Sequence, residues 1–98
     1  MKNFNMGGNM QQMMHQAQEA QKQMEKIKAD LAETAIEATA GGGMVTVEMT
    51  GAYELINLKI KPEAVDPDDV EMLEDLIIAA TNEALNQVNA LRAEKLPL

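Results

Sequence analysis

Apolar side chains recur along residues 9–31 at alternating spacings of three and four positions. This is the heptad pattern of a helix that packs lengthwise along a partner, and glutamine, glutamate and lysine fill most of the other positions. We therefore predict a helix from about residue 9 to residue 31, with Asn9 as its N-terminal cap. The apolar seam consists of Met10, Met13, Ala17, Ala20, Met24, Ile27 and Leu31.

The stretch before this helix, MKNFNMGG at residues 1–8, has no hydrophobic period and contains two glycines and two asparagines. Such a start is typical of a frayed terminus, so we predict a disordered segment over residues 1–8. Residues 9–96 then form one domain, because a chain of 98 residues is long enough for a single small core.

Three runs between residues 34 and 60 alternate apolar and polar side chains with a period of two, the period of a β-strand. They are Thr34–Ala40, Met44–Thr50 and Tyr53–Ile60, and the third places Ile56, Leu58 and Ile60 on one face. Glycines 41–43 separate the first two runs, and Gly51 with Ala52 separates the second and third. Because glycine reaches the positive φ angles of hairpin turns, we predict an antiparallel three-stranded meander.

A second long helix is predicted from about residue 67 to residue 94. Asp66 would cap it and Pro67 would occupy its first turn, a position that proline tolerates. Pro97 would end it. Its apolar stripe consists of Val70, Leu73, Leu76, Ile77, Ala80, Ala84, Val88 and Leu91.

The predicted order of helix, three-stranded antiparallel meander and helix gives an α/β (α+β) fold. Helices of this length span roughly 33 to 42 Å, whereas strands of six residues span about 20 Å. Long projecting helices with a continuous seam need a second chain, and the two-fold homodimer is the commonest solution. We therefore place the dimer interface on the first helix, at Met10, Met13, Met24, Ile27 and Leu31.

Composition excludes several classes of protein. The chain has no cysteine, which removes disulfides and thiol chemistry. No apolar run reaches the roughly 20 residues that a membrane helix needs, and the N-terminus lacks the apolar core of a signal peptide. We expect a cytoplasmic protein without a membrane partner.

Catalytic and metal sites find little support in the sequence. The only histidine, His15, lies on the helix face opposite the seam. The methionines at 10, 13 and 14 are explained better by the heptad than by Cu(I) binding, and the acidic run from Asp66 to Asp75 lacks the central glycine of a calcium loop. The glycines at 41–43 lack the lysine and following helix of a phosphate-binding P-loop. We expect no enzyme activity, cofactor, metal or small-molecule substrate.

Cations cluster on the two predicted helices, although the net charge is −8. Nearby acidic residues at 19, 25 and 30 could neutralise those on the first helix, and those at the end of the second suit the negative end of the helix dipole. These residues alone therefore indicate a dimeric interaction module of unknown partner. The clustered cations are Lys22, Lys26, Lys28, Arg92 and Lys95.

Four stretches together resemble the YbaB/EbfC family of bacterial nucleoid-associated proteins. They cover nearly the whole chain in order: MMHQAQEAQKQMEKIKADLA at 13–32, AGGGMVTVEMTG at 40–51, INLKIKPEAVDP at 56–67 and EMLEDLIIAATNEAL at 71–85. The resemblance implies a homodimer in the nucleoid that binds double-stranded DNA with limited sequence preference. It also implies helices that project from a central sheet, with no cofactor.

If the chain binds DNA, its negative charge requires a local cationic patch, because the duplex carries one negative charge per roughly 1.7 Å. Our hypothesis is that Lys22, Lys26 and Lys28 contact phosphates and that Arg92 and Lys95 assist them. The chain has one arginine, so we expect weak base readout. The alternative is a protein–protein adaptor that uses the methionine-rich helix and the acidic surfaces, since methionine suits adaptable partner binding.

Overall fold

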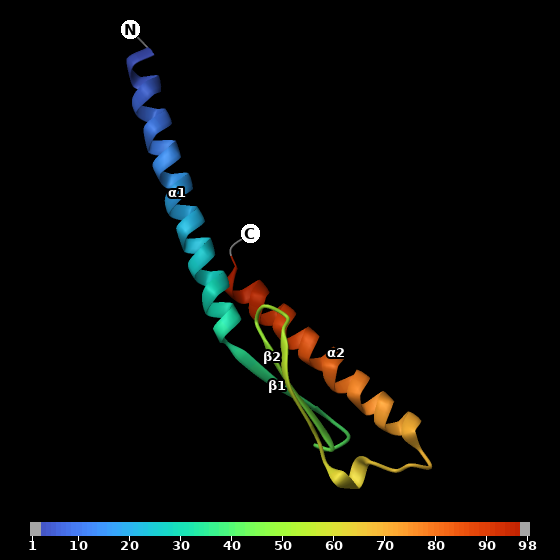
Figure 1. Cartoon of the computed structure of the whole chain (residues 1–98). Helices are drawn as coiled ribbons and strands as arrows, with labels where there is room; N and C mark the ends of the chain where they lie inside the picture. The colour runs from blue at the N-terminus through green and yellow to red at the C-terminus, as the bar shows by residue number, and fades with distance from the viewer. Residues whose placement is uncertain (1–2, 97–98) are drawn as a thin grey trace.

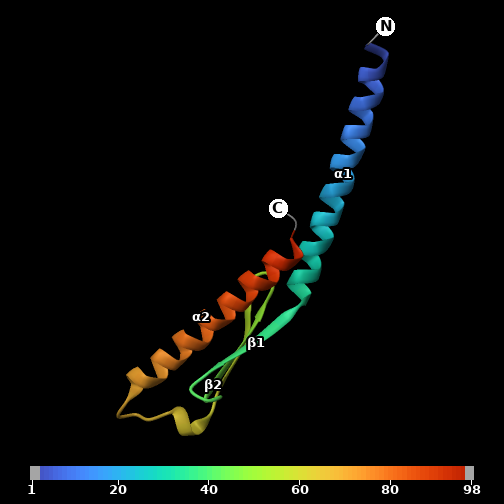
Figure 2. The same cartoon turned by 180° about the vertical axis from the view of Figure 1, so that it is seen from behind.

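The computed structural model describes residues 3–96 of the chain, and side chains from residue 8 onward. The chain forms a long helix, a three-stranded antiparallel sheet and a second long helix, which confirms the predicted fold class. Helix α1 (Asn3–Glu33) projects from one end of the sheet, whereas helix α2 (Val70–Lys95) runs alongside the sheet in both views (Figures 1 and 2). The molecule is an elongated rod with extents of 82 × 17 × 17 Å.

Helix α1 spans Asn3–Glu33 and therefore begins six positions before the predicted start at residue 9. Asn9 lies inside the helix and is not its cap, so that prediction is wrong. Residues 3–8, predicted to be disordered, are helical as well, whereas residues 1–2 lie outside the described residues. The hydrophobic pattern could not show this, because a helix that projects into solvent needs no apolar period, and each glycine within it costs only about 1 kcal/mol relative to alanine.

The sheet has the order β1-β2-β3, with β1 at Ala35–Ala40, β2 at Val45–Thr50 and β3 at Leu55–Ile60. Strand β1 pairs with β2 in an unbroken antiparallel register from Ala35↔Thr50 to Ala40↔Val45. The turn between them uses three positive φ angles, 64° at Gly41, 66° at Gly42 and 91° at Gly43. The predicted role of the three glycines as a strand-reversing turn is therefore confirmed.

Strand β3 pairs with β2 through an irregularity that the period-two pattern did not predict. Val45 pairs with Ile60 and Val47 with Leu58, but Met49 pairs with Leu55, which leaves Ile56 as an extra residue in β3. Such a bulge bends the strand and breaks the strict alternation of its side chains. The third strand is where the pattern predicts it, but the bulge at Ile56 was not predicted.

The core lies between one face of β1–β2 and helix α2, which packs on these two strands and has only sparse contacts with β3. Alanines on α2 let the helix approach the sheet closely, and valines of β2 fill the space between them. The buried residues of this core are Ala38, Val45, Val47, Met49, Ala80, Ala84 and Val88. Because α2 does not cover β3, Leu55, Ile56 and Leu58 remain 42–50% exposed.

Helix α2 spans Val70–Lys95, three residues later at its start than predicted. Its N-terminal cap is Asp69, whose carboxylate accepts a hydrogen bond from the Met72 N–H at 3.2 Å. Asp66 instead closes a turn by accepting from the Asp68 N–H at 3.0 Å, so the predicted cap is wrong. A short 3-10 helix, η1 at Pro62–Ala64, precedes this turn. Pro97, the predicted end of the helix, lies outside the described residues.

Candidate nucleic-acid interface

Two of the predicted DNA-contacting lysines share one exposed face of α1. Lys22 and Lys26 are one turn apart, about 40° around the helix axis at 3.6 residues per turn, and both side chains are exposed. Neither makes an ion pair with an acidic side chain of the described residues. The neutralisation of these lysines by neighbouring carboxylates, one interpretation of the sequence, therefore involves no close pairing here, and both ammonium groups are accessible to an anionic partner.

Lys28 does not belong to the same face. It lies about 160° around the helix from Lys26, on the flank of the apolar seam. A flat or gently curved ligand that contacts Lys22 and Lys26 on one helix cannot also contact Lys28 of that helix. The structure therefore brings together two of the three lysines that the sequence analysis grouped.

Arg92 binds its own chain at the junction of α2 with the β2–β3 turn. Its guanidinium donates to the Gly51 carbonyl oxygen at 2.8 Å and lies 5.0 Å from the centre of the Tyr53 ring, within cation–π range. The Tyr53 hydroxyl in turn donates to the Asn89 side-chain carbonyl oxygen of α2. These contacts hold the turn against the end of α2, so the guanidinium of Arg92 is already engaged within the chain.

Lys95 lies at the same junction, beside the last turns of α1. It lines a small hollow of about 100 Å³ together with Ile27, Asp30, Leu31, Thr34 and Leu91. Arg92 and Lys95 thus lie near the base of α1, and the positions of Lys22 and Lys26 one to two turns before Asp30 place those lysines further out along the projecting helix. The five predicted cations do not form one continuous patch.

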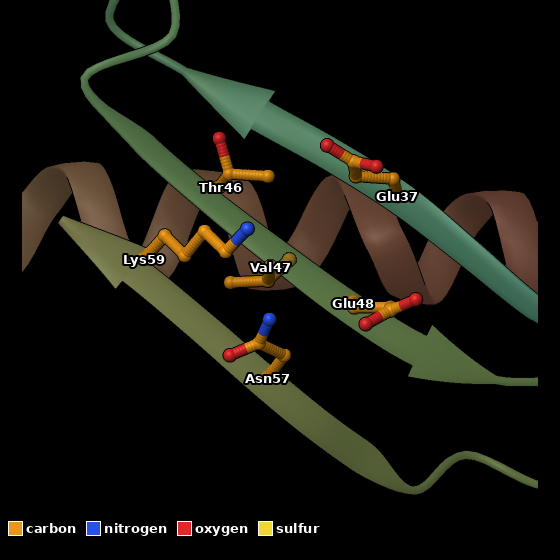
Figure 3. Close-up of a pocket in the computed structure, with 6 residues that line it drawn as sticks. All are labelled: Glu37, Thr46, Val47, Glu48, Asn57 and Lys59. Atoms are coloured by element: carbon orange, nitrogen blue, oxygen red, sulfur yellow. The ribbon is translucent and has the colours of Figure 1, made fainter.

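The sheet face that is turned away from α2 is polar and carries charges of both signs. Glu37 and Glu48 lie directly opposite each other on β1 and β2, an arrangement that like charges disfavour. Lys59 of β3 reaches across β2 beside them, and Asn57 lies two positions earlier on the same strand (Figure 3). This face is solvated in the single chain.

Two lysines at the end of β3 were not selected by the sequence analysis. Lys59 and Lys61 are two positions apart in extended backbone and so lie on the same side of the strand. They line a hollow of about 420 Å³ beside the glycine turn, together with Gly43, Thr46, Ile60 and Pro62. The sequence signal that could have identified these two lysines is the spacing Lys-x-Lys within an alternating segment.

The predicted dimer residues on α1 differ in exposure. Met10 is 60% exposed and Met13 is 67% exposed, whereas Met24 and Ile27 are half-buried. Leu31 is only 3% exposed because it packs against Gly51 of its own chain. The apolar seam is therefore open at Met10 and Met13, partly covered at Met24 and Ile27, and buried at Leu31.

The described part of the chain gives no support for a metal site or a membrane-spanning helix. His15 lies 3.9 Å from the Glu19 carboxylate on the exposed face of α1. Residues 3–96 contain no group of three or more histidine or acidic side chains that could hold a metal ion. Within the same range, neither long helix has an apolar stretch that would suit a bilayer.

A model of the YbaB/EbfC DNA-binding family matches residues 6–97 of the chain. A nucleoid-associated protein of Alkaliphilus metalliredigens is 58% identical over 82 residues, which cover 82% of this chain and 72% of that protein. A nucleoid-associated protein of Clostridium kluyveri is 48% identical over 94 residues, which cover 96% of this chain and 82% of that protein.

The fold also has a counterpart among solved structures. The crystal structure of an uncharacterized protein from Helicobacter pylori superposes with a TM-score of 0.77, covering 86% of this chain and 88% of that chain. The two sequences are 24% identical, so this likeness shows a shared fold alone.

Proposed function

Because the chain belongs to the YbaB/EbfC DNA-binding family, we propose that it acts as a homodimer that binds double-stranded DNA with little sequence preference and alters its conformation in the nucleoid. The relatives named as nucleoid-associated proteins support this proposal, since they are about half identical over most of the chain. DNA in the bacterial nucleoid is cytoplasmic, so we place the protein there. The family is a DNA-binding family and not an enzyme family, and we propose no catalytic role, cofactor or small-molecule substrate.

The observation that carries the proposal is the pair Lys22 and Lys26 on the exposed face of the projecting helix. Both lysines are exposed and neither is paired with a carboxylate. Ammonium groups in this state release condensed counterions when they reach phosphates, and this release drives nonspecific binding to duplex DNA. A single arginine in the chain, engaged at Gly51, supports weak base readout, because arginine makes the commonest specific contact to guanine.

The net charge of −8 per chain, or −16 for two chains, makes a local contact necessary. Repulsion between the remaining acidic surface and the duplex is screened beyond about 8 Å at physiological ionic strength. Because α1 projects from the sheet, most of its length lies away from the acidic start of α2, which carries Glu71, Glu74 and Asp75 (Figure 1). The projecting helix therefore gives an acidic protein a way to approach a polyanion.

We place the homodimer contacts on the apolar surfaces that a single chain leaves open. One is the α1 seam at Met10, Met13, Met24 and Ile27. The other is β3, an edge strand whose Leu55, Ile56 and Leu58 are not covered by α2. Exposed apolar edge strands invite pairing with another chain, and a second copy is the partner that is always present. Leu31, which the sequence analysis included, is occupied within its own chain.

A gel shift at about 0.15 M salt tests the DNA proposal directly, with random-sequence duplexes as the probe. Four phosphate contacts, from Lys22 and Lys26 of two chains, contribute about −3.6 to the slope of log K against log salt. Substitution of both lysines by glutamine should make the slope shallower by about this amount, whereas substitution by arginine should keep it. An unchanged slope in the glutamine variant would reject the lysine assignment, and unshifted DNA would reject the function.

The adaptor alternative is not supported by the comparisons, because the matching family is described by its DNA binding. The same gel shift separates the two classes, since an adaptor with a charge of −8 should leave the duplex unshifted.

A further inference from the structure

The three-glycine turn between β1 and β2 lies at the end of the sheet farthest from α1 (Figure 1). Lys61 adjoins it, because the Lys61 N–H donates to the Met44 carbonyl oxygen at 2.9 Å and thereby fixes the end of β3 beside the turn, and Lys59 lies two positions earlier on β3. The hollow between them, of about 420 Å³, is lined by Gly43, Thr46, Lys59, Ile60, Lys61 and Pro62.

Both ammonium groups are free of carboxylate partners within the described residues, 3–96, although acidic side chains occur nearby. Glu37 and Glu48 lie further along the same sheet face as Lys59, and Glu63 follows Pro62. Lys59 reaches over β2 without an ion pair to either glutamate (Figure 3). These two unpaired lysines place positive charge at one end of a protein whose net charge is negative.

The glycine turn adds neutral donors to these cations. The N–H groups of Gly42 and Gly43 make no backbone hydrogen bond within the described residues, whereas the Met44 N–H closes the turn on the Gly41 carbonyl oxygen at 3.4 Å. Gly42 has open space where a side chain would be, and a Cβ at Gly43 would stand 3.9 Å from the Lys61 ammonium. The bare backbone therefore lets a ligand approach both the amides and the ammonium group.

Thr46 completes the arrangement. It pairs directly with Lys59 across β2 and β3, so its hydroxyl group lies on the same face as the lysine side chain. The hollow thus offers hydrogen-bond donors that have no acceptor within the described residues: two ammonium groups, the free turn amides and a hydroxyl group. A phosphate group offers the matching acceptors and the opposite charge.

We propose that Lys59, Lys61 and the turn at Gly41–Gly43 form a second phosphate-binding site, which takes a backbone phosphate of duplex DNA. This inference rests on the proposed function, and it adds a contact at the opposite end of the sheet from the α1 lysines. The site holds the duplex by charge and backbone donors and reads no sequence.

The first test compares salt slopes of duplex binding for the wild-type chain and the K59Q/K61Q variant. Two contacts per chain, or four per dimer, predict that the slope becomes shallower by about 3.6 units. K59R/K61R should keep the wild-type slope. The variant N82E/N86E changes the net charge by the same two units at exposed positions of α2 and controls for general repulsion. Circular dichroism checks that every variant is folded.

The second test uses inorganic phosphate as the probe and amide chemical shifts as the readout. Phosphate should shift the Gly42 and Gly43 amide resonances of the wild-type chain, and K59Q/K61Q should abolish the shifts. A K59Q/K61Q salt slope equal to that of N82E/N86E, or phosphate shifts spread evenly over all lysines, would overturn the site while the proposed function stands. A wild-type chain that leaves DNA unshifted overturns the proposed function and, with it, the duplex as the ligand, even if phosphate still shifts the two glycines.

Discussion

Gly51 lies where the end of α1 meets the β2–β3 turn, and among the glycines from residue 8 onward it is the one where an added Cβ would come closest to another backbone segment. Its N–H donates to the Leu31 carbonyl oxygen at 2.9 Å, which ties the first helix to the sheet. A Cβ at this position would stand 2.6 Å from that same oxygen and 3.0 Å from the Leu31 Cβ. Position 51 therefore requires glycine, because the backbone at the end of α1 lies too close to leave room for a side chain.

We expect Gly51→Ala to lower the free energy of unfolding by about 1–3 kcal/mol, the usual cost of overpacking. Gly8→Ala is the matched control, because Gly8 is helical with open space around it, and there alanine should raise stability by up to about 1 kcal/mol. Urea unfolding monitored by circular dichroism measures both values. Equal effects of the two substitutions would show that the Leu31 contact does not constrain Gly51.

Substitution of Arg92 can distinguish a structural role of this side chain from a DNA-binding role. Arg92→Gln removes the charge together with the guanidinium hydrogen bond to Gly51 and the cation–π contact with Tyr53. We expect this variant to lose about 1 kcal/mol of stability while its salt slope for duplex binding stays at the wild-type value. A shallower slope with unchanged stability would instead return Arg92 to the DNA-contacting set.

At the scale of elements, the start of α2 shows where the sequence was ambiguous. Asp66 and Asp69 both precede a helical pattern, and either carboxylate could accept from the backbone three residues on. The turn at residues 66–69 decides between them, because it uses Asp66 to accept from Asp68 and leaves Asp69 for Met72. Local residue preferences cannot rank two identical side chains separated by a proline.

Substitution of the true cap should cost more than substitution of the predicted one. Asp69→Ala should reduce the free energy of unfolding by about 1 kcal/mol, since the Met72 N–H loses its acceptor. Asp66→Ala removes a bond in an exposed turn and should cost clearly less. Thermal unfolding of the two variants side by side gives the comparison, and the reverse order would place the cap at Asp66.

The strands and helices themselves were predictable because an element that buries one side carries apolar residues at regular intervals in the sequence. The alternation in β2 is complete, since every second residue from Val45 to Met49 is buried under α2. Where burial on one side ends, the prediction fails: β3 has little cover, so nothing in its pattern reveals the bulge at Ile56. Residues 3–8, at the start of α1, likewise show no hydrophobic period in the sequence.

The candidate site was predictable only in part, for a related reason. Lysine positions are visible in a sequence, but their grouping depends on rotation about α1, which separates Lys28 from Lys22 and Lys26. Partners distant in sequence decide the rest: Arg92 meets Gly51 across 41 positions, and Lys61 meets the glycine turn through the pairing of β2 with β3. Contacts of this kind require the sheet register, which one sequence does not provide.

The rotation about α1 leads to a prediction for the helix as an element. K22Q/K26Q should make the salt slope shallower by about 3.6 units for a dimer, whereas K28Q should change it by less than about 1 unit. Lys28 then serves as the internal control, with the same residue type and charge on the same helix. Equal effects per lysine would mean that the duplex wraps around α1 and does not lie against one face.

At the scale of the whole molecule, the arrangement of apolar surface indicates where a second chain belongs. Helix α2 covers two strands of three, and α1 extends beyond the sheet with methionines exposed along its seam. Within residues 3–96 the chain has no further element that could bury either surface, because the one that remains, η1, has three residues. The dimer proposal therefore has two candidate contact surfaces, and they make different predictions about which residues of two chains face each other.

The absence of cysteine from the sequence allows a clean experiment to separate them, since any introduced thiol is the only one. Met13→Cys places a thiol on the α1 seam, Leu58→Cys places one on β3, and His15→Cys places one on the opposite face of α1 as the control. Under mild oxidation, a variant whose thiol lies near its partner's thiol should form a covalent dimer of two 10.7 kDa chains, which non-reducing gels resolve. If the β3 surface contacts the second chain, Leu58→Glu should raise the dimer dissociation constant by at least about tenfold, equivalent to about 1.4 kcal/mol, in sedimentation velocity. Cross-linking of His15→Cys as efficient as that of the other two variants, or a folded monomer of the wild-type chain at micromolar concentration, would contradict the dimer.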